Sequence, residues 1–454
     1  MRRFGKILPC LLVAPSPALA HAAEQGFVLL LPTDVYGAAG TATVAASMLL
    51  MAAVPGRLAV ALFRPLKTPL APAGPVTASS LAATAVFLTL VAIGLLGPTD
   101  PQINLMPLTL WTVWWMGLLV VQGVAFDVWR WVEPWSGLTR LLSIPPPLRL
   151  PAWLGAWPAV AGLITFQAFV LIDIAPNDPA RLATVALSYW AVTLAGMLVF
   201  GPDWLARAEF VTVTFRLIGR LRAWHRPGLG LPGWAALEAP PDRARAVLCL
   251  TILATGSFDG LSETFWWLGR LGINPLEFPG RSAVALPNLV GLVAAIILLI
   301  ALFAAAVWVG CALSARLGAP VPVGRAFDAF AVTILPIGLG YHFAHYVVTF
   351  LVQGQYVLAA LADPFAHGWS LPPFDAVRIR TGFLATPGPV RTIWLIQAGA
   401  VVASHVLAVL MAHRVAARLA RGHRAVVALQ LGLAVLMIGY TIFGLWLLAS
   451  PRGA

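Results

Sequence analysis

The sequence predicts an all-α, polytopic integral membrane protein: a helical bundle of about ten transmembrane helices. Of its 454 residues, 60% are hydrophobic and only 10% are charged, and the mean hydropathy is +0.87. Soluble domains carry about 25% charged residues, so this composition excludes a large water-soluble globule. The apolar residues also gather in stretches long enough to cross a bilayer, separated by proline, glycine and charged residues.

The first 20 residues have the organisation of a secretory signal peptide. A basic start at residues 2–6 precedes a short apolar stretch, and Ala18-Leu19-Ala20 forms a small-residue cleavage site. Cleavage there would leave residues 21–454 as a single transmembrane domain that begins with His21. An N-terminal histidine offers both an amine and an imidazole nitrogen to a metal. The alternative is that His21 follows the cleavage site by chance and has no role.

Ten spans are predicted in the mature chain. A bilayer core of roughly 30 Å requires about 20 apolar residues in a helix, and loop residues mark where each such stretch ends. The predicted spans are 36–54, 78–97, 108–126, 151–172, 182–201, 246–267, 288–313, 326–352, 392–412 and 425–449.

The distribution of Lys and Arg predicts the orientation of these spans. The loops after the first, third, fifth, seventh and ninth spans carry most of these residues, and cytoplasmic loops are enriched in them. We therefore expect both ends of the mature chain on the outer, periplasmic side, in agreement with the export signal. The densest basic stretch, 203–226, interleaves arginines with apolar residues, which predicts an amphipathic helix on the inner leaflet.

The net charge of +12 does not indicate a nucleic-acid-binding protein. A basic excess is one sign of such proteins, but here it lies in predicted cytoplasmic loops, where anionic lipid headgroups attract it. We therefore expect the lipid bilayer as a partner and no nucleic acid. The sequence also contains no Walker A loop, Rossmann glycine fingerprint or His-Glu-X-X-His motif, so nothing indicates nucleotide use.

Two carboxylates lie inside the predicted span 246–267. Ionisable residues within a membrane are costly and mark a functional site by default. Asp259 and Glu263 are four residues apart, which places them on one face of a helix. At about 1.5 Å per residue from the inner end of the span, Asp259 lies roughly 20 Å along the helix, in the outer half of the bilayer.

Histidines lie at a similar depth on other spans. His342 and His345, in the predicted span 326–352, are three residues apart and also share a helix face. His342 lies roughly 24 Å along its span from the inner end. His405, in the ninth span, lies somewhat deeper in the bilayer.

Imidazoles and carboxylates at one depth predict a site for a divalent transition metal such as Zn, Fe, Mn or Cu. The expected ligands are His342, His345, His405 and Asp259, with His21 as a weaker candidate. Asp259 and Glu263 are also the candidates for a general base or for a group that orients a ligand. The alternative is that these side chains satisfy one another through interhelical hydrogen bonds, worth about 0.6–2 kcal/mol.

Several motifs together resemble a known membrane family. They are residues 257–260 (SFDG), 265–267 (FWW), 274–282 (NPLEFPGRS), 341–346 (YHFAHY), 355–356 (QY), 363–365 (DPF) and 440–446 (YTIFGLW). Over most of the mature chain, the sequence resembles a bacterial integral-membrane family named after membrane-bound fenitrothion hydrolase, specifically its FedB-type subunit. The resemblance implies a multi-pass protein of the bacterial inner membrane that hydrolyses organophosphate esters and has a second membrane subunit as a partner.

We therefore expect a metal-dependent membrane hydrolase of small hydrophobic phosphotriesters, with Asp259 and Glu263 as its catalytic carboxylates. Arg281, in the outer loop after the sixth span, is expected either to meet a leaving or charged group or only to anchor that loop. Two alternatives remain open. One is a transporter that binds and relays an ion, protons or a metal through the same groups, and the other is a non-catalytic subunit of a membrane complex.

Overall fold

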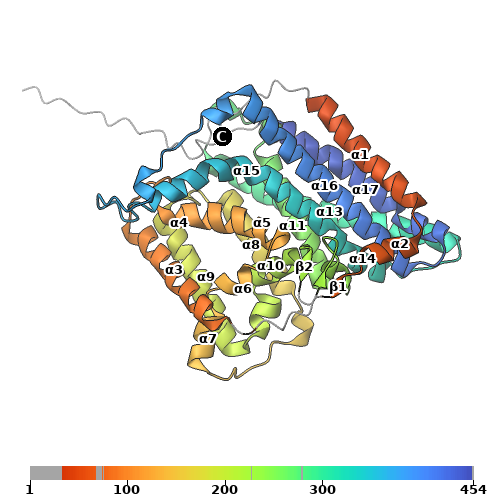
Figure 1. Ribbon diagram of the computed structural model, residues 1–454, viewed down its shortest axis with the longest axis horizontal. Coiled ribbons are helices and arrows are strands. Elements are labelled where there is room, and N and C mark those ends of the chain that lie inside the picture. Colours follow the sequence, from red (N-terminus) through yellow and green to blue (C-terminus); the bar gives the residue numbers. More distant parts are fainter. Residues whose placement is uncertain (1–32, 68–73, 75, 226–227, 278–279, 452–454) are drawn as a thin grey trace, which may run out of the picture.

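The computed structural model describes residues 33–67, 74, 76–225, 228–277 and 280–451, and these are almost entirely helical (Figure 1). The predicted signal peptide at 1–20 and His21 lie outside the described residues. Within them, eight helices are long and apolar enough to cross a membrane, and a bent helix pair would make a ninth span. The chain is thus a polytopic helical membrane protein, which confirms the predicted fold class.

The structure consists of long helices joined by short helical and irregular segments. The longer helices are α1 (Thr33–Ala53), α3 (Thr77–Leu96), α8 (Trp157–Ile172), α9 (Pro179–Phe200), α10 (Phe210–Gly219), α11 (Arg243–Ser262), α13 (Arg281–Arg316), α15 (Leu335–Ala360), α16 (Pro387–Leu419) and α17 (His423–Ala449). The shorter α-helices are α2 (Gly56–Leu62), α4 (Leu105–Pro107), α5 (Leu119–Val124), α6 (Trp129–Val132), α7 (Ser136–Leu142), α12 (Phe265–Arg270) and α14 (Val323–Ala331).

The remaining elements are short. Two are π-helical, η1 (Leu108–Leu118) and η3 (Trp204–Ala208). The 3₁₀ segments are η2 (Ala152–Leu154), η4 (Ala235–Leu237), η5 (Pro275–Glu277), η6 (Val332–Ile334), η7 (Phe374–Ala376) and η8 (Gly382–Ala385). Two-residue strands β1 (Leu66–Lys67), β2 (Trp224–His225) and β3 (Gly228–Leu229) form an antiparallel ribbon in the order β1-β3-β2, in which Leu229 pairs with both Leu66 and Trp224.

Helices α11 and α15 lie at the centre of the bundle. Helix α11 packs against α8 and α13, and α15 packs against η1 and α16 as well as against α11. In Figure 1, the early helices α3, α8 and α9 lie on one side of this central pair, and α1, α16 and α17 lie on the other. The central pair is therefore shielded from lipid by helices from both halves of the chain.

Two of the ten predicted spans differ from the structure. The span predicted at 151–172 is α8, which has only 16 residues. It is therefore about 24 Å long, shorter than the roughly 30 Å hydrocarbon core. Gly155, at a φ of 51°, ends the short 3₁₀ segment that precedes it. The span predicted at 36–54 is α1, which meets α2 at an angle of 113° around Pro55, a residue that has no backbone N–H to donate.

The stretch 203–226 is not the surface helix that its charge pattern predicts. Its helix α10 has nine of ten residues buried, and only Arg216 is exposed. The Glu209 carboxylate caps α10 by accepting hydrogen bonds from the backbone N–H groups of Val211 and Thr212, each at 2.7 Å. Helix α10 packs against α5, α8 and α15, so its apolar residues contact protein instead of lipid.

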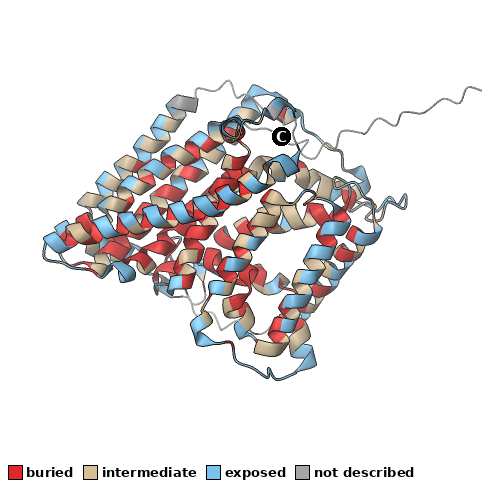
Figure 2. Ribbon diagram, turned by 180° about the vertical axis from the view of Figure 1, so that it is seen from behind, coloured by how far each residue is buried: buried red, intermediate tan, exposed pale blue. Residues whose placement is uncertain are grey.

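The outer surface of the bundle is apolar, as contact with lipid requires. Buried residues gather in the interior, and exposed residues lie on the outward faces of the long helices (Figure 2). On α13 the exposed side chains include Leu286, Val290 and Ile297, which are 69%, 60% and 62% exposed. Large apolar side chains at these positions would be unfavourable in water but are expected against acyl chains.

Helices α13 and α17 approach each other through two glycines. A Cβ added to Gly310 would lie 2.0 Å from the carbonyl oxygen of Leu429, and one added to Gly432 would lie 2.1 Å from the carbonyl oxygen of Ala306. Any larger residue would push the two backbones apart. Small residues at helix interfaces allow this close packing in membranes, where packing itself drives association.

Replacing Gly432 with valine should therefore destabilise the bundle. We expect Gly432→Val to lower the midpoint of thermal unfolding of the detergent-solubilised protein, because overpacking an interface costs about 1–3 kcal/mol. Gly439→Val is the matched control on the same helix, since nothing lies within 4 Å of a Cβ at Gly439. Equal midpoints for the two variants would contradict the α13–α17 contact.

Candidate metal centre

Helices α11 and α15 bring three metal-ligating side chains together. One ligand atom from each of Asp259, Glu263 and His345 lies within 4.8 Å of the other two. The Nε2 atom of His345 lies 3.2 Å from Oδ2 of Asp259. Asp259 and His345 are buried, while Glu263, which follows the last residue of α11, is half-buried. The structure thus joins both predicted carboxylates to one of the predicted imidazoles.

Gly260 permits the close approach of the two helices. A Cβ on Gly260 would lie 1.9 Å from the hydroxyl oxygen of Tyr341 and 3.5 Å from Nδ1 of His345. The Tyr341 ring stacks against the His345 imidazole at a centroid distance of 5.8 Å. A residue with a side chain at position 260 would displace Tyr341 and, through it, the imidazole that faces Asp259.

Tyr346 completes the group, and the sequence analysis missed it. Its hydroxyl donates a hydrogen bond to Oδ2 of Asp259 at 2.5 Å. Its ring packs edge-to-face against His342 and His345, at centroid distances of 4.8 and 4.4 Å. The signal that would have found it is its position four residues after His342, on the same face of α15. Tyr346 thereby fixes the orientation of one carboxylate of the group.

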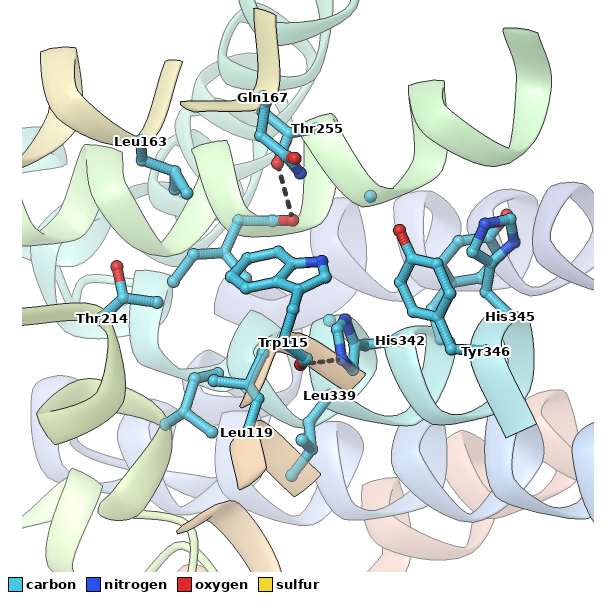
Figure 3. Close-up of a pocket in the computed structure, with 15 residues that line it drawn as sticks. Trp115, Leu119, Leu163, Gln167, Thr214, Thr255, Leu339, His342, His345 and Tyr346 are labelled. Carbon is cyan, nitrogen blue, oxygen red and sulfur yellow. Dashed lines mark hydrogen bonds between the residues drawn. The ribbon is translucent and has the colours of Figure 1, made fainter. Parts of the chain in front are cut away.

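His342 does not belong to the three-residue group, in contrast to the prediction. Its Nε2 donates to the backbone carbonyl of Trp115 at 3.0 Å, and its ring meets the Trp115 indole edge-to-face at 5.4 Å. Figure 3 shows this contact beside the cavity that both residues line. A separation of three residues rotates His342 by about 60° from His345 around the helix axis. With this rotation the His342 ring contacts Trp115 of η1.

Two further predicted residues also lie elsewhere. His405 is buried on α16, and its Nδ1 bonds the carbonyl of Val401, one turn earlier in the same helix, at 2.8 Å. It is not part of the described metal-ligating group, because its imidazole is held by its own helix. His21 falls outside the described residues.

Arg281 caps the end of helix α8. Its guanidinium donates to the backbone carbonyls of Asp173 and Val170, at the end of α8. Beside it, Arg181 forms an ion pair with the Asp173 carboxylate at 2.6 Å. Partial burial raises the pKa of Asp173, but the hydrogen bond and charge of Arg181 outweigh this effect and lower it overall. Arg281 thus satisfies carbonyls that the last turn of α8 leaves unpaired.

The donor set suits a divalent cation with an open coordination position. Carboxylate and imidazole ligands together suit Zn, Fe and Mn. Structural zinc sites have four protein ligands, whereas catalytic sites have three and leave one position for water or substrate. Asp259, Glu263 and His345 supply three. Because Glu263 is half-buried at the end of α11, the group is reachable from that end of the helix.

A small internal cavity adjoins this group. It has a volume of about 30 Å³ and is lined by residues that include Tyr341, His342, His345 and Tyr346 (Figure 3). Pockets for small organic molecules are about ten times larger. A cavity of this size accepts water but not an organic substrate.

The fold and the site together define a multi-pass helical membrane protein with a buried Asp–Glu–His group that could hold a metal ion. No protein-family model, curated protein or solved structure matches the chain.

Substitutions in the group should remove a bound metal. We expect the detergent-purified wild type to carry a divalent metal, and Asp259→Asn and His345→Ala to lose most of it, because each removes one of three ligands. Elemental analysis of the purified proteins measures this. His405→Ala is the control, since His405 is a buried histidine outside the group. The same metal content in all four proteins would contradict the metal site.

Removing the Tyr346 hydroxyl should weaken metal binding without abolishing it. Residues that orient a ligand typically contribute about 10–100-fold to metal affinity, so we expect Tyr346→Phe to lower affinity by that factor. Competition with a chelating dye measures the change. Tyr440→Phe is the matched control, because its hydroxyl bonds Ser257 at 2.6 Å instead of a member of the group. An equal loss in both variants would contradict the role of Tyr346.

Proposed function

We propose that this protein is a metal-dependent membrane hydrolase that cleaves hydrophobic organophosphate esters at the Asp259–Glu263–His345 group. The observation that carries the proposal is the convergence of the three ligand atoms within 4.8 Å of one another in the interior of a membrane bundle. The substrate class, fenitrothion-like phosphotriesters, comes from the resemblance to the FedB-type family. The same resemblance makes a second membrane subunit part of the proposal.

Each residue of the group has its own role in the proposed hydrolysis. Asp259, Glu263 and His345 would each hold the metal through one atom, and Tyr346 fixes Asp259 through its hydrogen bond. A divalent metal there supplies Lewis acidity, which lowers the pKa of a water and polarises a phosphoryl oxygen. The second carboxylate oxygen of Glu263, the most exposed member of the group, would take the proton of the attacking water. The water oxygen bonds to phosphorus, the P–O bond to the aryl group breaks, and the aryloxide leaves with the bonding electron pair.

The ester is expected to enter from the side of Glu263. The cavity beyond His345 is about 30 Å³, so it is too small for a phosphotriester. Three residues after Glu263, the Trp266 side chain on α12 is 49% exposed. It packs edge-to-face with Trp446 of α17 at 6.0 Å. These aromatic rings offer an apolar surface to an aryl ester that partitions into the bilayer.

One observation favours a second candidate, a protein that handles cations or protons. Buried carboxylates and histidines inside membrane bundles often mark ion pathways. Here they adjoin a cavity that is large enough for water and too small for an organic molecule. In this alternative the group binds an ion and releases it again without breaking a covalent bond.

The deciding experiment measures hydrolysis and uptake on the same preparation. We expect wild-type protein in sealed lipid vesicles, loaded with metal, to release the nitrophenolate of a fenitrothion-like ester. Glu263→Gln should slow this release by about 10²–10⁴-fold, the usual contribution of a general base. His405→Ala should be close to wild type. Metal accumulation inside the vesicles without nitrophenolate release would overturn the hydrolase and support ion handling.

A further inference from the structure

A small internal cavity extends from the metal-ligating group toward α10. At one end it is lined by His345 and Tyr346, and at the other by Thr214 of α10 (Figure 3). None of its lining residues is exposed. The cavity therefore lies inside the bundle, between the candidate metal centre and the helix that the charge pattern placed on the membrane surface.

The wall of this cavity contains a buried polar group without a hydrogen-bond partner. The Thr214 side-chain oxygen forms no hydrogen bond in the described structure. Thr214 is only 2% exposed. A buried polar group left unpaired costs about 1–3 kcal/mol, and more than 90% of such groups have a partner. Gln167, also buried, adds an amide to the same wall.

Water is the partner that fits both the size and the chemistry of this space. Purely apolar cavities stay dry, whereas a polar cavity of at least about 10–15 Å³ per molecule holds water. A volume of about 30 Å³ accommodates about two water molecules on this scale. Those waters would satisfy the Thr214 side-chain oxygen, which has no partner in the described structure.

We propose that this cavity is an internal water site that feeds the metal centre from inside the bundle. Hydrolysis consumes one water for each ester bond broken, and an apolar ester that covers the Glu263 side would exclude water from that direction. A second, polar route would let water reach the metal centre while the hydrophobic ester covers the Glu263 side. The use of this water rests on the proposed hydrolase, but the presence of the water does not.

The presence of this water is measurable in the full-length protein by X-ray radiolysis. Radiolysis turns bound water into hydroxyl radicals that oxidise adjacent side chains, and mass spectrometry locates the products. Since Trp115 is buried, its oxidation reports internal water and not bulk solvent. We expect Trp115 to be labelled in the wild type and Thr214→Val to reduce the labelling about threefold, because a polar wall retains the water.

Thr441→Val is the matched control. Thr441 is also fully buried, but it lies on α17 and donates to the Met437 carbonyl at 2.8 Å, away from the cavity. Gln167→Leu is the second test variant, in case Thr214→Val alters folding. Labelling of Trp115 that is absent in the wild type, or that is unchanged by both cavity variants, would overturn the water site.

The same variants separate this inference from the proposed function. Trp115 labelling that falls in the cavity variants, with no ester hydrolysis by any protein, would support the water site and count against the hydrolase. Hydrolysis that depends on Glu263 and is unaffected by Thr214→Val, with no labelling of Trp115, would overturn the water site alone. If both inferences hold, Thr214→Val lowers kcat and leaves KM unchanged, because it removes water and not ester binding.

Discussion

The contact between Asp259 and the two α15 side chains His345 and Tyr346 is the interaction on which the centre of this bundle depends. A carboxylate in a membrane interior is costly unless it is paired, so α11 and α15 must lie close enough for these hydrogen bonds. Gly260 makes that distance accessible, since any Cβ there would collide with Tyr341. The same geometry then places Glu263 one turn further, where α11 ends and the interior becomes reachable.

Pairing and metal binding are not exclusive explanations of this group. Interhelical hydrogen bonds in membranes contribute about 0.6–2 kcal/mol, whereas binding of a structural zinc ion releases roughly 10–16 kcal/mol. A metal ion that binds the Asp259 oxygen and the His345 nitrogen replaces the contact between them. The free energy of that lost contact is small compared with the free energy of metal binding. The hydrogen bonds hold the ligands in place when the ion is absent, which is the preorganisation that a binding site requires.

The fold was more predictable from the sequence than the site. Apolar length alone predicts most of the spans, because lipid imposes that length on any helix. The charge pattern is misleading for 203–226, because its alternation of arginine and apolar residues belongs to a helix, α10, that is buried in protein. At the site, the spacing of Asp259 and Glu263 was sufficient because residues four apart share one helix face. The position of the His342 side chain depends on its hydrogen bond to Trp115 of another helix. A contact between residues so far apart in the sequence cannot be predicted from the residues around His342.

The charged end of α11 gives the site its expected orientation. Next to the start of α11, Arg414 and Arg418 donate to the Leu237 carbonyl at 3.0 and 2.8 Å, and Arg243 pairs with Asp328 at 2.5 Å. Basic residues collect on the cytoplasmic side of membrane proteins, so this end is expected to face inward. Glu263 lies at the opposite end of the same helix. The metal-ligating group is then expected to open to the outer side. The internal water site extends the other way, toward the inner half of the bundle. Substrate and water would therefore approach the metal from opposite directions.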